Sequence, residues 1–82
     1  MEIVKLTEFI IKELVQDPDS VSVKEFPSEK ENEMIVQVMI PESDMGRVIG
    51  KGGNIAKSIR TVVQASSFVK DNKRVNINID SY

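Results

Sequence analysis

The chain has 82 residues with a net charge of −2, and 40% of its residues are apolar, which suits one domain (residues 1–82) with a small core rather than two domains. It contains neither cysteine nor histidine, so disulfides and thiolate metal sites are excluded, the commonest general base and metal ligand are missing, and neither enzymatic activity nor a cofactor is expected. No run of about 18 apolar residues and no basic, cleavable leader is present, which predicts a cytoplasmic protein that does not associate with membranes.

The first predicted element is a helix over residues 2–16. Apolar residues such as Ile10 and Leu14 recur three or four positions apart, as on one face of a helix, and Pro18 disfavours helical backbone in the residue before it. Phe9 falls on the polar face of this helix. Either it folds over the helix edge into the core, or it contacts a partner, and the sequence leaves both interpretations open.

Two strands follow, over residues 20–26 and 34–40, and a polar connection joins them at residues 27–32. The second strand is almost continuously apolar, which is typical of a central strand. The alternation places Met34, Val36, Val38 and Ile40 toward the core and Ile35 and Met39 on the opposite face.

A short helix is predicted over residues 45–49, with Ser43 or Asp44 as its N-cap, and a longer helix over residues 54–68. The longer helix separates its apolar and polar arcs clearly. Its apolar stripe consists of Ile55, Ile59, Val62 and Val63, which we expect to lie in the core. An alternative is that part of this stripe seats a symmetric dimer.

The last predicted element is a strand over residues 74–80, in which apolar residues alternate strictly with polar ones. The first two strands should pair antiparallel. Because a two-helix crossover precedes the third strand, it should lie parallel to the second. The predicted fold is therefore α+β, in the order α-β-β-α-α-β, with three helices on one face of a mixed three-stranded sheet.

Charge is distributed unevenly along the chain. Residues 1–44 carry eleven acidic and four basic side chains, whereas residues 45–70 carry five basic side chains and no acidic one. A basic patch on an acidic protein suits contact with a phosphate backbone. Charge alone would equally fit a solvated helix face. The patch therefore indicates a binding site only together with the motif that it surrounds.

That motif is the glycine turn, Gly50-Lys51-Gly52-Gly53, between the two predicted helices. Glycines without a Cβ allow a ligand backbone to come close. The helix that follows offers unpaired N–H groups and the positive end of its dipole to an anion. The spacing therefore predicts a phosphate-binding turn, and Lys51 adds a positive charge.

The segment Val48-Ile49-Gly50-Lys51-Gly52-Gly53-Asn54-Ile55 resembles the V-I-G-x-x-G-x-x-I core of KH domains, with the isoleucine one position earlier than in the commonest family pattern. A helix and a strand placed before this core resemble the type II arrangement. Nearly the whole chain is similar to the small bacterial KH-domain proteins of the KhpA family.

This resemblance implies a grip on about four nucleotides of single-stranded RNA or DNA. Bases would lie in an apolar groove with Val48, Ile49, Ile55 and Ile77 as candidates for its floor, although Ile49 and Ile77 are also natural core residues. The residues implied in RNA binding are Arg47, Val48, Ile49, Gly50, Lys51, Gly52, Gly53, Asn54, Lys57 and Arg60.

The resemblance also implies partners and a cellular role. Members of the family resemble proteins that pair with a larger bacterial KH-containing protein of the KhpB or Jag family, and self-association as a homodimer is the alternative that the resemblance implies. The implied role is that of an RNA chaperone or post-transcriptional regulator linked to cell shape, cell length and cell-wall biogenesis.

Two competing interpretations come from other functional classes. A P-loop would require four residues between its glycines and a serine or threonine after the lysine, but Gly46 and Gly50 enclose three residues and Gly52 follows Lys51. The other alternative is a protein-interaction module without nucleic-acid binding. The intact glycine turn argues against it, because a turn without a ligand would be free to acquire side chains.

Overall fold

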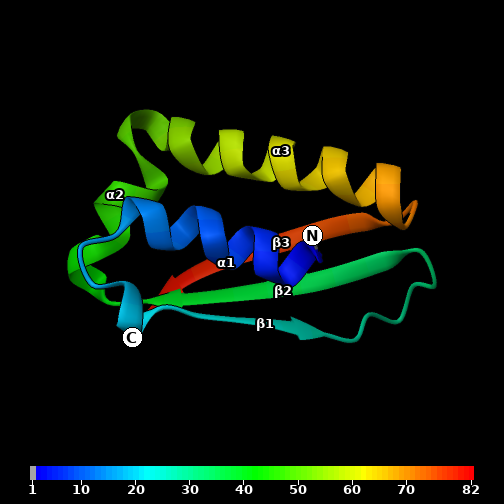
Figure 1. Cartoon of the computed structure of the whole chain (residues 1–82), viewed down its shortest axis with the longest axis horizontal. Coiled ribbons are helices and arrows are strands. Elements are labelled where there is room, and N and C mark those ends of the chain that lie inside the picture. Colours follow the sequence, from blue (N-terminus) through cyan, green and yellow to red (C-terminus); the bar gives the residue numbers. More distant parts are fainter. Residues whose placement is uncertain (1) are drawn as a thin grey trace.

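The computed structural model describes residues 2–82 and contains a three-stranded sheet whose helices all lie on one face (Figure 1). The elements are α1 (Ile3–Leu14), β1 (Ser22–Phe26), β2 (Glu33–Ile40), α2 (Met45–Ile49), α3 (Asn54–Lys70) and β3 (Arg74–Ser81). Short 3₁₀ helices at Pro18–Ser20, Glu42–Asp44 and Lys51–Gly53 connect them. The predicted α-β-β-α-α-β order is confirmed, and each predicted boundary lies within two residues of the observed one.

The central strand of the sheet is β2, as its nearly continuous apolar sequence predicts. It pairs antiparallel with β1, from Ser22 opposite Met39 to Phe26 opposite Ile35. On its other side it pairs parallel with β3 along its whole length. The parallel pairing follows from the crossover, because α2 and α3 return the chain to the end of the sheet where β2 began.

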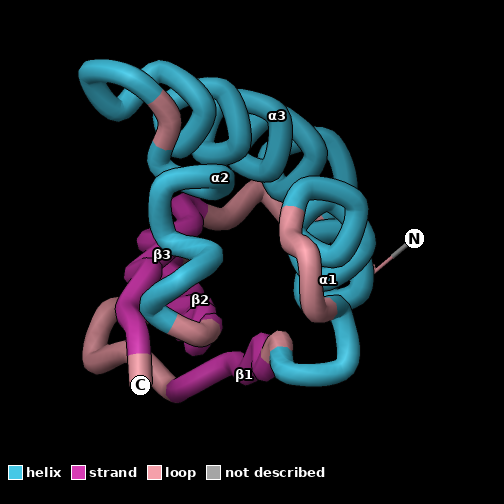
Figure 2. Tube along the Cα trace, turned by 90° about the vertical axis from the view of Figure 1, so that its left-hand side faces the viewer, coloured by secondary structure: helices cyan, strands magenta, loops and turns pink. Residues whose placement is uncertain are grey.

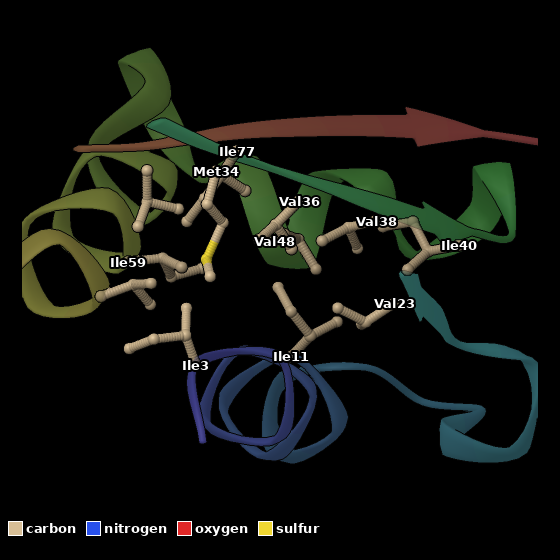
Figure 3. Packing of buried hydrophobic residues seen from close by; sticks show 12 residues of the cluster. Ile3, Ile11, Val23, Met34, Val36, Val38, Ile40, Val48, Ile59 and Ile77 are labelled. Atoms are coloured by element: carbon tan, nitrogen blue, oxygen red, sulfur yellow. The ribbon is translucent and has the colours of Figure 1, made fainter. Parts of the chain in front are cut away.

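The core lies between this sheet and the helices (Figure 3). From β2 it receives the four side chains expected from the alternation, each at most 8% exposed. The helices contribute Ile3 and Ile11 of α1, Val48 of α2, and Ile59 and Val63 of α3. Helix α1 contacts β1 and helix α3 contacts β3, so the two helices cover opposite sides of the sheet face (Figure 2).

The other face of the sheet carries no helix within residues 2–82 (Figure 2). Asn76 and Asn78 of β3 are exposed there, and Ile35 and Met39 of β2 are half-buried. This second face is therefore open and carries exposed polar side chains along β3.

Two apolar residues that the sequence analysis considered as core residues, Phe9 and Val62, are exposed. Phe9 is 55% exposed, so its side chain does not fold over the helix edge into the core. It stands two residues from both Thr7 and Ile11, which are buried, and therefore about 200° around the helix from each. Val62 is 51% exposed, because Ile59 and Val63 occupy the buried face of α3 and Val62 lies at the side of that face.

Candidate nucleic-acid interface

The glycine turn connects α2 to α3 at one end of the molecule (Figure 1). Its backbone requires glycine at three positions, because φ is +74° at Gly50, +66° at Gly52 and +79° at Gly53. L-amino acids with side chains rarely adopt this left-handed region. As predicted, a short helix and not a strand leads into the turn, which distinguishes it from a P-loop.

The three glycines differ in what surrounds them. A Cβ on Gly50 would lie 2.6 Å from Cγ1 of Ile55, so this glycine lets the first turn of α3 pack against α2. A Cβ on Gly52 or Gly53 would meet no atom within 4 Å. The outer half of the turn is therefore bare backbone beside open space, which a ligand can approach closely.

The turn also forms the start of α3, a helix of 17 residues. Gly53 is its N-cap and provides no side-chain cap. The N–H of Gly53 donates to the carbonyl oxygen of Gly50 at 3.1 Å. The N–H of Asn54, the first residue of α3, donates to the carbonyl oxygen of Lys51. What the helix start offers to an anion is therefore the positive end of the α3 dipole, with no side chain in front of it.

Cations surround this helix start. Lys51 and Lys57 are exposed, and the ion pairs found among residues 2–82 involve other side chains. Arg47 lies with Nε 3.5 Å from Oδ1 of Asp44, yet its side chain is 53% exposed. Arg60 donates from Nε and Nη2 to the carbonyl oxygen of Ile77, at 3.4 Å each. The structure therefore leaves the two lysines unpaired and ties both arginines to neighbouring elements.

Asp44 does not cap α2 through its side chain, contrary to one of the two capping predictions, and no side-chain cap is formed at this helix. Its carboxylate instead accepts hydrogen bonds from the backbone N–H groups of Gln16 at 3.0 Å and Asp17 at 3.4 Å. It is 2% exposed. Asp44 therefore joins the segment that follows α1 to the start of α2 and holds the element that carries the turn.

The four proposed floor residues divide into two pairs. Val48 and Ile77 are buried in the core cluster, at 0% and 5% exposure. Ile49 and Ile55 are half-buried, and Ile49 lies outside that cluster, so its interpretation as a pure core residue is wrong. Apolar surface is thus available on both sides of the turn, from the last residue of α2 and the second residue of α3.

Gly46 was absent from the predicted site. It lies within α2, its Cβ position has no atom within 4 Å, and its φ is not positive, so neither packing nor backbone geometry requires glycine. A helical glycine costs about 1 kcal/mol relative to alanine. Gly46 stands four residues before Gly50, whose N–H donates to the carbonyl oxygen of Gly46 at 3.0 Å, and this spacing is the signal that could have identified it.

The chain is similar in sequence to proteins of one known family. The sequence model described as the KH domain of KhpA/KhpB matches residues 4–79. The RNA-binding protein KhpA of Clostridium acetobutylicum is 48% identical over 75 residues, which cover 92% of this chain and 96% of that protein. The RNA-binding protein KhpA of Borreliella burgdorferi is 38% identical over 76 residues, 93% of this chain and 89% of that protein.

Solved structures share the fold at low sequence identity. A GDP–aluminium fluoride complex of Aquifex aeolicus Era matches with a TM-score of 0.71 and 15% identity. The match covers 98% of this chain and only 30% of Era. Era in a complex with 16S ribosomal RNA matches with a TM-score of 0.67 and 17% identity, over 96% of this chain and 29% of that one. These similarities concern the fold alone. Within residues 2–82, no helix combines the length and apolar character that crossing a bilayer requires.

Proposed function

Because the chain belongs to the KhpA/KhpB family of KH domains, we propose that it binds single-stranded RNA through the glycine turn. The observation that carries this proposal is the bare outer half of the turn, at Gly52 and Gly53, beside an uncapped helix start. Relatives such as the Clostridium perfringens protein, 45% identical, are named RNA-binding proteins rather than enzymes. A binding role without catalysis accounts for both the bare turn and the names of these relatives.

In the proposed complex the sugar-phosphate backbone runs across the turn. A phosphate lies at the start of α3, where the helix dipole favours negative charge. Lys51 and Lys57 supply unpaired positive charge, and Arg47 adds a third cation at the end of α2. The open surface at Gly46 gives the strand a second place of close approach, one helical turn before Gly50.

Bases would then lie on the apolar surface that Ile49 and Ile55 leave half-exposed. No aromatic side chain belongs to this group of residues, so stacking on rings contributes little at the turn. We expect weak binding with little sequence preference. Single strands are favoured because a duplex of A-form RNA hides its base edges in a groove that side chains cannot read.

Fluorescence anisotropy with a labelled single-stranded RNA, repeated over a series of salt concentrations, tests this function. Two to four phosphate contacts should give a slope of log K against log[salt] of roughly −1.5 to −3, at about 0.7 per phosphate for single strands. A duplex of the same sequence is the matched control and should bind less tightly. Absence of binding to any unpaired oligonucleotide at low salt, or equal binding to the duplex, would contradict the proposal.

A second surface suits a protein partner. We define the α1–α3 strip as the apolar surface between these helices, at a groove of about 470 Å³ lined by Ile10, Leu14, Asn54, Ile55, Ser58, Ile59 and Val62. Residues Ile55, Val62 and Val69 repeat every seven positions along α3, the spacing of a helix–helix seam. Val62 is 51% and Val69 87% exposed, which is unusual for apolar residues in such a repeat.

We propose that this strip pairs the domain with another KH-containing chain, either a second copy or a larger protein of the KhpB or Jag type. Pairing centred on Val62 and Val69, away from Asn54 and Ile55, leaves the glycine turn and its apolar surface uncovered in each partner, so one complex presents two RNA-binding turns. In this scheme the protein acts in the cytoplasm as an RNA chaperone or post-transcriptional regulator, with effects on cell length and cell-wall synthesis. The family membership supports this role, and the exposed strip supports the pairing.

Val62→Lys should abolish self-association, because it places a charge where an apolar seam would form. Thr61→Lys is the matched control, since Thr61 is the exposed neighbouring residue on another face of the helix. Sedimentation equilibrium at increasing protein concentration measures the outcome. A dimer that persists in Val62→Lys, or a parent chain that stays monomeric both alone and with a KhpB-type protein, would contradict pairing through the strip.

A further inference from the structure

The carboxylate of Asp44 is held in one orientation at the start of α2. Its Oδ1 accepts from the backbone N–H of Gln16 at 3.0 Å, and its Oδ2 accepts from the backbone N–H of Asp17 at 3.4 Å. Each oxygen thus has its own donor, from one of two consecutive residues, and Asp44 is 2% exposed. Two hydrogen bonds to one planar group fix its orientation. The carboxylate is therefore a fixed anchor, directly before the helix that leads to the glycine turn.

Arg47 is the cation that faces this anchor. It stands three residues after Asp44, a spacing at which side chains on a helix are neighbours, and its Nε lies 3.5 Å from Oδ1 of Asp44. The two members of the ion pair differ in exposure, since the side chain of Arg47 is 53% exposed and that of Asp44 only 2%. The surface therefore presents the cation of the pair, and the carboxylate is hidden from solvent.

The contact through Nε matters because of the shape of a guanidinium group. The group carries five N–H donors in a fixed planar arrangement, one on Nε and four on the two Nη atoms. A carboxylate that engages Nε leaves the Nη donors for another acceptor. Paired donors of this kind bind a phosphate through two parallel hydrogen bonds, which the ammonium group of a lysine does not reproduce.

Arg47 stands where the phosphates of the proposed RNA complex pass. It belongs to α2, three residues before Gly50, and its neighbour Gly46 has no atom within 4 Å of its Cβ position. A long side chain loses rotamer freedom when a ligand immobilises it, which lowers affinity about 2- to 12-fold for each such side chain. An arginine that is already held at Nε has lost part of this freedom before RNA binds.

On these grounds we propose that Asp44 is a positioning residue for RNA binding, which holds Arg47 by Nε so that the Nη donors face a phosphate at the glycine turn. The proposal rests on the proposed RNA binding and adds to it a residue that itself touches no RNA. Because the anchor depends on the N–H groups of Gln16 and Asp17, the segment after α1 becomes part of the support of the interface.

Asp44→Asn separates positioning from charge, because the two effects predict changes of opposite sign. Removal of a negative charge near a polyanion should by itself strengthen binding. Loss of positioning should weaken it. We expect Asp44→Asn to bind a single-stranded RNA tetramer about 2- to 12-fold more weakly than the parent chain. Fluorescence anisotropy measures this, at a temperature where circular dichroism shows both proteins to be folded.

A double-mutant cycle tests whether the effect passes through Arg47. Arg47→Met keeps an unbranched side chain and removes the donors, so Asp44→Asn should cause no further weakening in that background. The matched cycle uses Lys57→Met, because Lys57 lies in α3 and the ion pair of Asp44 is with Arg47. In that background Asp44→Asn should weaken binding as it does in the parent chain. Equal weakening in both backgrounds would mean that Asp44 supports the turn and not Arg47, and it would overturn the proposal.

A second measurement needs no RNA. Magnetic resonance of the Arg47 Nε–H group should show slower exchange with water in the parent chain than in Asp44→Asn, and equal exchange in the two would overturn the anchor. A parent chain that binds no unpaired RNA overturns the proposed function, and the positioning role with it. A parent chain that binds, together with an Asp44→Asn variant that binds as tightly or more tightly, overturns the positioning role alone.

Discussion

Replacing Lys51 and Gly52 together by aspartate should abolish RNA binding and leave the fold intact. The double variant changes the charge of the turn by three units, in a region (residues 45–70) whose charges sum to +5. One pair of charges about 4 Å apart in water is worth about 1 kcal/mol. Three units therefore correspond to about 3 kcal/mol, or on the order of a 100-fold loss of affinity.

The fold should survive because both positions tolerate the change. Lys51 is exposed. A Cβ on Gly52 meets no atom within 4 Å, and although φ there is +66°, aspartate is among the residues that enter this region most readily. Circular dichroism should therefore resemble that of the parent, and thermal unfolding should show a loss of stability of about 1–2 kcal/mol from backbone strain.

The matched control places the same change of charge at the opposite end of the molecule. Lys30→Asp with Asn32→Asp alters two exposed residues in the connection between β1 and β2 (Figure 1). Binding of a four-nucleotide RNA, measured by anisotropy, should be lost in the turn variant and kept in the control. Equal loss in both would mean that net charge rather than the turn governs binding, and equal retention would remove the turn from the site.

The features that the sequence predicted most reliably are those that depend on a single helix, strand or turn. The alternation in β2 identified its four core residues, and the Gly50–Gly53 spacing located the turn between two helices, because both patterns follow from the period of the local backbone. The parallel pairing of β3 was also predictable, since a crossover connection leaves few topologies.

The errors arose where two elements meet. Periodicity shows which face of α3 is apolar, yet it does not show that Val62, at the side of that face, remains exposed while Val63 is buried. Ile49 ends a short helix at the edge of the molecule, so its apolar character alone could not exclude it from the core cluster. Arg60 stays a predicted RNA-binding residue, and the pattern could not show that its guanidinium also donates to the carbonyl oxygen of Ile77 in β3. Contacts of this kind depend on tertiary placement, which the local pattern does not contain.

The carboxylate of Asp44 illustrates the same limit, and its loss should have the largest effect on stability. The sequence suggested a helix cap, whereas the structure places this side chain, 2% exposed, against backbone N–H groups 28 and 27 residues earlier in the chain. Each hydrogen bond to a charged group contributes about 1.5–3 kcal/mol, and a buried donor left without a partner costs about 1–3 kcal/mol. The longer hydrogen bond, at 3.4 Å, should contribute a free energy at the low end of the first of these ranges.

Asp44→Ala should therefore lower the free energy of unfolding by about 2–4 kcal/mol, measured by urea denaturation. Asp44→Asn should cost less, because its amide oxygen still accepts from Gln16 while its amide nitrogen faces the donor of Asp17. Asp19→Ala, at an exposed position, should change stability by about 0.5 kcal/mol at most. Arg47→Ala separates the ion pair from the hydrogen bonds, since a pair with one exposed partner contributes about 1 kcal/mol or less. If Asp44→Ala costs no more than Arg47→Ala, the two backbone hydrogen bonds do not hold α2 in place, and the turn must be positioned by the packing of Val48 and Ile55 alone.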